Sequence, residues 1–526
     1  MRPRPLLFAC LALCLLGLAA ASFKLRLSPL PVGDEATHVL MARSLWEDHD
    51  LLYEKTDLDR AYRIWNEGPA GLSLLTTDGS RTLRYGEPLA WALVATPAWG
   101  LFGAAGLPIL NMALFLAMLA GAVWLFQDSN PLFLGGFFFA SASFGYVFRG
   151  SPEVFLMASV FFALLLWKRE KPVPAGVLLG VASLYQPWLA LLGLALIVSR
   201  RKGAIPLLLA GILAFGVLSI PQWDRGAQRR TFEADFPLES DTWQSYGDQA
   251  TVADIGLLPR NFWYFLVGRN TGLIPAFPFA VLALIFLARD RWPLLAAIGI
   301  ILLLGLVLEP HRWHGGPGAL GNARFAVLYP AFLFLPRSFP RWSLVPAFAA
   351  AGLWTSVLVA GAIVPPPPHP GEIATFRVLP LELTLLGEGV QLPGYGVRNW
   401  GQGLWVVPRA SFWMEEGVWV RGASASEIVV ISPKPLKELR FRVDSPGENE
   451  ILLEGAERVL VRFDGKRNGA PVRLPLEPAA TGLGLLPGTE KEWIYRFTLT
   501  VRDGIIPARR QPGNQDPRYL GVFLDL

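Results

Sequence analysis

A series of long apolar runs constrains this chain more than any other feature of its sequence. Most runs are close to the roughly 20 residues that an α-helix needs to cross a bilayer. They lie at 6–23, 107–126, 131–148, 152–167, 173–185, 187–199, 203–220, 272–288, 292–308, 323–336 and 342–364. Only 17% of the 526 residues are charged, against roughly 25% in soluble globular proteins. The sequence therefore predicts a polytopic α-helical membrane protein with about eleven transmembrane helices.

The first apolar run has two interpretations. Arg2 and Arg4 precede it, and Ala19-Ala20-Ala21-Ser22 at its end would suit a signal peptidase, so it could be a cleaved signal peptide. We favour a retained first helix, because the run reaches membrane length and many spans follow it. Under either interpretation the chain emerges outside the cytoplasm from residue 24 onward.

The positions of the basic residues predict which loops are cytoplasmic, because Lys and Arg accumulate on that side. Basic clusters lie at 168–171, 200–202, 289–291 and 337–341. All four fall inside only if residues 88–103 do not cross, so we expect Pro88 to Gly103 to lie in the outer interface or to dip partway. The N-terminus is then cytoplasmic, and residues 24–106, 221–271, 309–322 and the C-terminal tail are extracytoplasmic. The net charge of +5 includes no dense basic tract, so we expect no nucleic-acid partner.

The sequence changes character after residue 364. Pro365 to Pro368 end the last apolar run, and short alternating segments of β-rich composition follow. These lie at 404–407, 417–420, 427–431, 439–443, 459–463, 493–501 and 519–524. We predict a transmembrane domain at 1–364 and an extracytoplasmic, jelly-roll-like all-β sandwich domain at 365–526. Carbohydrate binding and a structural cap are both open roles for the tail.

The first outer loop, 24–106, carries the acids that are candidates for chemistry. Asp34 and Glu35 stand at the start of a predicted helix that runs over 36–45. His38 lies one helical turn after Asp34 and therefore on the same side. Asp34 could also be a helix N-cap with no further role.

Several short motifs resemble those of the GT-C-fold glycosyltransferases, a superfamily that includes aminoarabinose transferases, protein O-mannosyltransferases and many bacterial members of unassigned substrate. The first outer loop carries Gly33-Asp34-Glu35, His38, Ala42, Ser44-Leu45 and Asp48-His49-Asp50-Leu51. Further matches are Tyr85-Gly86-Glu87-Pro88-Leu89, 149–153, 268–272, 314–316, 321–325 and 518–523. Aminoarabinose transferases have a lysine and two prolines where this chain has Glu87-Pro88-Leu89, so that cation is absent here. The similarity is greatest to the unassigned bacterial members.

The resemblance implies an inverting transfer of a sugar from a polyprenyl-phosphate donor to an extracytoplasmic acceptor, which is a cell-envelope glycan, lipid or protein. It implies a multi-pass protein of the bacterial plasma (inner) membrane. Asp34 would be the catalytic base, and Glu35 and Glu153 would orient the acceptor or share a divalent cation with it. The use of a metal is open, and no other cofactor is expected. Arg149 is close to Glu153 in sequence and could pair with it.

The remaining candidate residues would bind the donor phosphate or the substrates. Arginine suits phosphate because its planar guanidinium donates two parallel hydrogen bonds, although an arginine at a helix end can also snorkel to the interface. The phosphate candidates are Arg269, Arg312 and Arg324, and the substrate candidates are His38, Tyr85, Glu87, His314 and Asn322.

Two other functions are compatible with the sequence. One is a transporter or flippase for lipid-linked sugars, which ionisable residues within the spans would favour; we find almost none at mid-span. The other is a non-catalytic envelope assembly protein that displays the β domain. Both remain alternatives to the glycosyltransferase.

Overall fold

The chain forms two compact units in a computed structural model. Unit 1 comprises Met1–Val267 and Thr271–Ala362, and unit 2 comprises Gly268–Asn270 and Ile363–Leu526. The described residues are 5–21, 34–65, 69, 72–77, 83–126, 131–220, 227–232, 253–316, 319–336, 344–349, 352, 379–387, 395–400, 403–408, 412–414, 417–464, 469–486, 489, 491–507 and 518–525. Gly33, Pro365 to Pro368 and the predicted domain boundary lie outside them.

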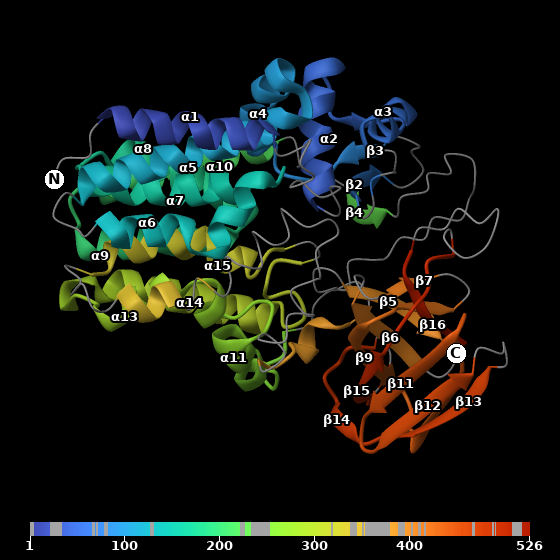
Figure 1. The fold of residues 1–526 in the computed structure, drawn as a ribbon. Helices are drawn as coiled ribbons and strands as arrows, with labels where there is room; N and C mark the ends of the chain where they lie inside the picture. The colour runs from blue at the N-terminus through green and yellow to red at the C-terminus, as the bar shows by residue number, and fades with distance from the viewer. Residues whose placement is uncertain are drawn as a thin grey trace. The chain divides into compact units, whose positions relative to one another are not determined.

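Unit 1 is mainly helical (Figure 1). Its α-helices are α1 (Pro5–Ala21), α2 (Asp34–Glu47), α3 (Lys55–Trp65), α4 (Leu89–Phe102), α5 (Gly106–Leu125), α6 (Pro131–Phe139), α7 (Glu153–Lys168), α8 (Pro172–Tyr185), α9 (Ala190–Ser199), α10 (Ala204–Ser219), α11 (Leu258–Val267), α12 (Leu273–Ala276), α13 (Pro278–Ile285), α14 (Trp292–Leu308) and α15 (Ala323–Leu328). Its 3₁₀ helices include η1 (Gly103–Ala105), η2 (Ala142–Phe148), η3 (Pro187–Leu189), η5 (Arg289–Arg291) and η6 (Tyr329–Phe334).

The predicted apolar runs are mainly helical where the structure describes them, but several are interrupted, and Leu287 and Pro336 at the ends of two runs form an isolated β-bridge. Two segments of the described chain, Leu89–Leu125 and Arg289–Leu308, are long and apolar enough to cross a bilayer. The other apolar helices of this set are 10–17 residues long, such as Pro172–Tyr185 and Ala204–Ser219. The expectation of about eleven spans is therefore supported only in part, because glycine, proline and 3₁₀ turns break the runs. Most of 342–364 lies outside the described residues.

The segment Leu89–Leu125 is not a single straight helix. Gly103 has a φ of 60° and separates α4 from α5. A Cβ at Gly106 would lie 2.0 Å from the carbonyl oxygen of Ala98, so the start of α5 lies directly against α4. The placement of 88–103 at the outer interface stays a prediction.

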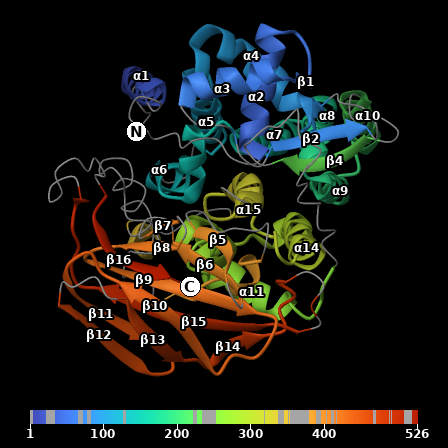
Figure 2. The same cartoon turned by 90° about the vertical axis from the view of Figure 1, so that its right-hand side faces the viewer.

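Glycines bring α8 and α10 into direct backbone contact. A Cβ at Gly176 would lie 2.2 Å from the carbonyl oxygen of Leu207, and one at Gly180 would lie 2.3 Å from that of Gly211. Small residues at this spacing allow membrane helices to approach closely. Figures 1 and 2 show the two helices alongside each other, next to α7.

Residues of the predicted first outer loop, together with residues 227–232 from the 221–271 segment, form a small α/β substructure. Its antiparallel sheet consists of β1 (Leu52–Tyr53), β2 (Leu72–Thr77), β3 (Leu83–Tyr85) and β4 (Ala227–Phe232), in the order β1-β3-β2-β4. The core of this substructure joins Ala36, Leu40 and Met41 of α2 to Leu74 and Tyr85 of the sheet. The other side of α2 packs Val39 and Ala42 against Trp91 and Trp99 of α4. This double packing fixes α2, which carries the candidate acids.

Unit 2 contains two antiparallel sheets (Figures 1 and 2). One has the order β13-β10-β16-β8-β7, and the other has β12-β11-β15-β9-β6-β5, with β14 paired to β15. The strands are β5 (Tyr395–Trp400), β6 (Gly403–Pro408), β7 (Phe412–Met414), β8 (Val418–Arg421), β9 (Ser424–Ser432), β10 (Glu438–Asp444), β11 (Glu448–Glu454), β12 (Arg458–Asp464), β13 (Ala470–Pro475), β14 (Pro478–Thr481), β15 (Trp493–Val501) and β16 (Leu520–Asp525). A short 3₁₀ helix, η9 (Leu383–Leu385), precedes them.

One hydrophobic core joins the two sheets of unit 2. It includes Val420 and Phe441 from the first sheet and Val430, Phe497 and Ile451 from the second. The burial pattern of β10 alternates between inside and outside, as expected for a strand with one covered face. All seven predicted strand segments lie within or overlap observed strands, so the antiparallel β character of the tail is confirmed.

Candidate functional site

The helix α2 presents its two acidic residues differently. Asp34 is its first residue and is exposed, whereas Glu35 is only 9% exposed. Carboxylates in the first turn are favourable because the helix N-terminus carries a partial positive charge. Two adjacent acids therefore have two environments, one open to solvent and one inside the protein.

Glu35 is held by the segment that follows η2. Its Oε1 accepts a hydrogen bond from the backbone N–H of Gly150 at 2.7 Å, and its Oε2 accepts one from Nη1 of Arg149 at 3.1 Å. The same segment is fixed from other helices, because the Trp91 indole donates to the Gly150 carbonyl and Asn111 donates to the Arg149 carbonyl. The partner of Arg149 is therefore Glu35, and within the described part of the chain Arg149 forms no ion pair with Glu153, its neighbour in sequence.

Glu153 is the first residue of α7 and lies close to Glu35 and Arg149. We call these three residues the acid centre. Glu153 Oε2 is buried and has no hydrogen-bond partner among the described residues. Glu35 and Arg149 are close enough to act on its charge. A buried carboxylate oxygen without a partner is costly, which makes Glu153 a candidate to bind a hydroxyl group, a water molecule or a cation.

His38 and Glu87 form a second buried pair. His38 Nε2 lies 3.6 Å from Glu87 Oε2, and both side chains are almost fully buried. The ring of His38 also lies 5.8 Å from that of Tyr185, whose hydroxyl donates to the Pro88 carbonyl. The structure brings His38 and Glu87 together, and their role in substrate binding stays a prediction.

Tyr85 has a different environment from the other substrate candidates. It belongs to β3 and to the hydrophobic core of the α/β substructure, with its ring 5.7 Å from that of Tyr53. Burial raises the pKa of its phenol well above the ordinary value. Its position is that of a core residue.

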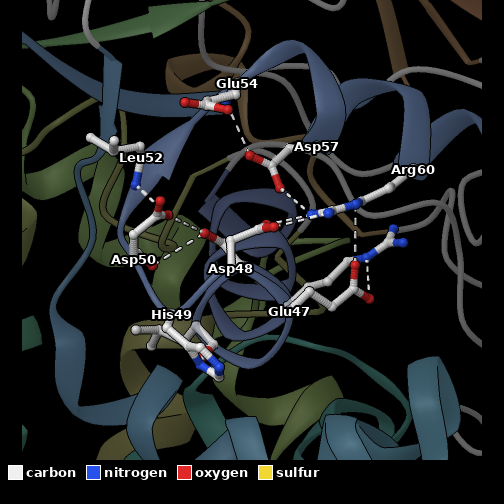
Figure 3. A network of polar contacts seen from close by, with 11 residues as sticks. Glu47, Asp48, His49, Asp50, Leu52, Glu54, Asp57 and Arg60 are labelled. Carbon is white, nitrogen blue, oxygen red and sulfur yellow. Dashed lines mark hydrogen bonds and ion pairs between the residues drawn. The ribbon is translucent and has the colours of Figure 1, made fainter.

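The acidic tract at the end of α2 stabilises a turn (Figure 3). Asp48 binds the Arg60 guanidinium through both carboxylate oxygens. Asp50 Oδ1 accepts hydrogen bonds from the Ser44 hydroxyl at 2.9 Å and the Leu52 N–H at 3.1 Å. The tract connects α2 to β1 and α3. These contacts give Asp48 and Asp50 a structural role, so no ligand is needed to explain the two acids.

Arg324 lies at a small cavity beside the C-terminal half of α14. The polar residues that line it are Gln186, Trp313, Asn322 and Arg324, and its apolar wall includes Ile301, Leu302 and Leu306. Gln186 Oε1, Trp313 Nε1 and Arg324 Nε are buried without a hydrogen-bond partner in the described part of the chain. The cavity volume is about 10 Å³, room for roughly one water molecule.

The guanidinium of Arg324 already has neighbours. It forms an ion pair with Glu309 and lies 5.9 Å from the ring of Trp188. A donor phosphate at this position would have to displace the Glu309 carboxylate. Trp188 and Gln186 are residues that the sequence did not single out, since they follow an ordinary helix end.

The loop before α15 contains three of the predicted residues. His314 is fully buried, and burial together with the nearby Arg324 and Arg312 lowers its pKa to about 3. His314 is therefore neutral near pH 7. Asn322 is the N-cap of α15 and accepts from the Phe325 N–H at 2.9 Å, so capping accounts for this residue.

The loop is tied to the acid centre by Tyr146. Its hydroxyl donates to the Leu320 carbonyl at 2.8 Å and accepts from the Leu320 N–H at 2.9 Å. Glu153, Arg149 and Glu35 are all close enough to Tyr146 to interact with it electrostatically. The acids and the Arg324 loop thus belong to one end of unit 1.

Arg269 lies elsewhere, within unit 2. Its guanidinium is fully buried and forms an ion pair with Glu427 of β9. It also donates to the Leu379 carbonyl at 3.3 Å, while its backbone N–H donates to the Pro380 carbonyl. In this structure Arg269 neutralises a buried carboxylate, and its predicted contact with the donor phosphate stays a prediction.

No cluster of three or more His, Cys, Asp or Glu side chains suited to a metal ion occurs among the described residues. Metal use therefore stays open, with Glu153 as the side chain that has a buried oxygen to offer.

Comparisons with known proteins give little further guidance. No family model matches the chain, and no curated protein matches it. A solved structure of the arabinosyltransferase EmbB from Mycobacterium smegmatis matches with a TM-score of 0.32 and 11% identity, covering 97% of this chain and 64% of that one. The chain thus spans less than two thirds of that protein's length. A TM-score this low carries no argument about function.

Proposed function

We propose that this chain is an integral membrane glycosyltransferase with a GT-C-like transmembrane domain, which transfers a sugar from a polyprenyl-phosphate donor to an extracytoplasmic acceptor. The observation that carries the proposal is the paired environment of Asp34 and Glu35. The exposed carboxylate of Asp34 directly precedes that of Glu35, which is held by the Arg149 guanidinium and the Gly150 N–H. This arrangement holds a base at a fixed position on the outer end of the helical unit.

In the proposed reaction, Asp34 accepts the proton of the acceptor hydroxyl as that oxygen attacks the anomeric carbon of the sugar. The bond from the anomeric carbon to the donor phosphate breaks, and the phosphate oxygen leaves with the electron pair. A single displacement inverts the anomeric configuration, as in other single-displacement sugar chemistry. Glu35 positions Asp34 through α2, because its carboxylate is held by Arg149 and Gly150.

Glu153 and the pair of His38 and Glu87 would contact the acceptor. Their support is proximity to the acid centre and, for Glu153, a buried oxygen without a hydrogen-bond partner in the described structure. A hydroxyl donor would satisfy that oxygen, and a divalent cation would do the same.

The donor phosphate would bind Arg324, with Arg312 nearby. Support comes from the buried polar atoms without partners around Arg324 and from the adjacent apolar wall of α14. That combination suits a phosphate joined to a prenyl chain. Glu309 would leave Arg324 when the donor enters, and the cavity, which here has room for roughly one water molecule, would have to widen.

The experiment is gene deletion in the host, followed by mass spectrometry of lipid-linked sugars. Complementation uses wild type, Asp34→Asn and the matched control Asp59→Asn, which changes another exposed acid of the same outer region. We expect one polyprenyl-phosphate sugar to accumulate and only wild type and Asp59→Asn to remove it. A normal lipid profile with Asp34→Asn at equal expression would overturn the proposal and favour transport or assembly.

A further inference from the structure

A second cavity lies between two turns of the helical unit, away from the residues of the proposed reaction. It has a volume of about 210 Å³ and is lined by Trp167, Glu170, Pro172, Arg200, Lys202 and Gly203. One wall is the turn from α7 to α8, and the other is the turn from α9 to α10. The cavity is large enough for a phosphate group.

Positive charge predominates around this cavity. Arg200 and Lys202 line it, and Glu170 is the one acid among the lining residues. Arg200 Nη2 lies 2.8 Å from Glu170 Oε1, and this contact holds the pKa of Glu170 below its ordinary value. Glu170 therefore stays ionised. When no external anion is bound, Glu170 pairs with Arg200, one of the two cations that line the cavity.

The walls of the cavity are rigid. Gly203 has a φ of 92°, and a Cβ there would lie 3.2 Å from Pro172, so the two turns touch. Behind them, Gly176 of α8 is in backbone contact with Leu207 of α10. The helix α10 starts at Ala204, so its N-terminus adds a partial positive charge beside Lys202.

An exposed apolar surface leads away from the cavity. Along α10, Ile205 is 72% exposed, Leu209 is 64% exposed and Ile212 is 68% exposed. Residues three or four apart share one side of a helix, so these three form a stripe that starts one residue after Ala204. A ligand with both an anionic group and an alkyl chain would be complementary to the cavity and the stripe together.

We propose that this cavity binds the phosphate of an anionic phospholipid whose acyl chain lies along the exposed side of α10. Arg200 and Lys202 contact the phosphate, and Glu170 competes with it for Arg200. The inference requires α10 to face lipid but does not depend on sugar transfer.

The test is native mass spectrometry of the full-length protein in neutral detergent, titrated with phosphatidylglycerol. We expect Arg200→Gln and Lys202→Gln each to weaken binding by about fivefold, and Glu170→Gln to strengthen it by a similar factor. Arg201→Gln is the matched control, because Arg201 is an exposed cation in the same turn that does not line the cavity. It should change binding by less than about twofold.

Three results would overturn the inference. Equal weakening by Arg201→Gln and Arg200→Gln would mean general attraction to a basic surface. Equal affinity for phosphatidylcholine would remove the role of the anionic charge. Competition by glycerol phosphate or inorganic phosphate at the concentration at which phosphatidylglycerol binds would identify a site for a free anion instead of a lipid.

Discussion

Replacing Gly150 with alanine tests whether the contact between Glu35 and Gly150 positions the proposed base. A Cβ at Gly150 would lie 2.3 Å from Val39 Cγ2, whereas ordinary contacts are 3.4–4 Å. Val39 is β-branched and lies within α2, so its side chain has little freedom to rotate away. The variant must therefore separate α2 from the 149–151 segment by about 1 Å.

This displacement of α2 should lower both the stability of the protein and its rate of sugar transfer. Overpacking of this size destabilises a protein by about 1–3 kcal/mol. Because Asp34 is on the helix that moves, a misplacement of about 1 Å should lower the transfer rate by roughly 10²-fold. The assay measures the initial rate of sugar transfer and the thermal unfolding midpoint of purified protein.

Two controls separate positioning from general damage. Gly135→Ala adds the same methyl group to α6 where nothing lies within 4 Å, and it should keep the wild-type rate. The double variant Gly150→Ala with Val39→Ala removes the clash and should recover most of the activity. A Gly150→Ala protein with a rate within twofold of wild type would refute the positioning role of this contact.

Three further changes have expected outcomes. Arg269→Met should destabilise unit 2 by about 1–3 kcal/mol, because it removes the buried one of the two arginines that pair with Glu427; urea unfolding measures this, and an unchanged midpoint would contradict it. Burial raises the pKa of Asp57 to about 6, so the folded state binds more protons than the unfolded state between about pH 4 and 6. The contribution of Asp57 to stability should therefore be greatest below about pH 4 and be lost, up to about 3 kcal/mol, as the pH rises through 6, a loss that Asp57→Asn should not show. Asp50→Ala removes the acceptor of two hydrogen bonds and should lower the unfolding free energy by about 1–3 kcal/mol. An unchanged denaturant midpoint would contradict the stabilising role of Asp50 in the turn after α2.

Local patterns in the sequence predicted the elements of the fold well. Most of the apolar runs form helices, and the alternating segments form strands. These elements depend on the spacing of apolar residues and on turn residues, which are signals contained within a few neighbouring positions. The breaks within the apolar runs and the close contacts between helices were harder to predict. The break at Gly103 and the backbone contact at Gly176 depend on what packs against each residue.

Contacts between distant residues could not be predicted from one sequence. Glu35 and Arg149 are 114 positions apart, and Arg269 and Glu427 are 158 positions apart. Each arginine has several acids nearer in sequence, so charge pattern alone does not select its partner. Asp34 is a candidate because two acids at a helix start and the resemblance of its motif to a known family are local signals, and its role stays a prediction, whereas the contacts of Gly150 and Tyr146 required the fold.

The most direct test of the account is conversion of the donor by purified protein. Lipid extract from the deletion strain is incubated with wild type or Asp34→Asn in detergent, together with an envelope fraction as acceptor, and the polyprenyl lipids are measured by mass spectrometry. The account predicts that wild type releases free polyprenyl phosphate as the sugar moves to the acceptor, and that Asp34→Asn does not. If Asp34→Asn released it at the wild-type rate, or if wild type left the sugar–phosphate bond intact, the central claim would be contradicted.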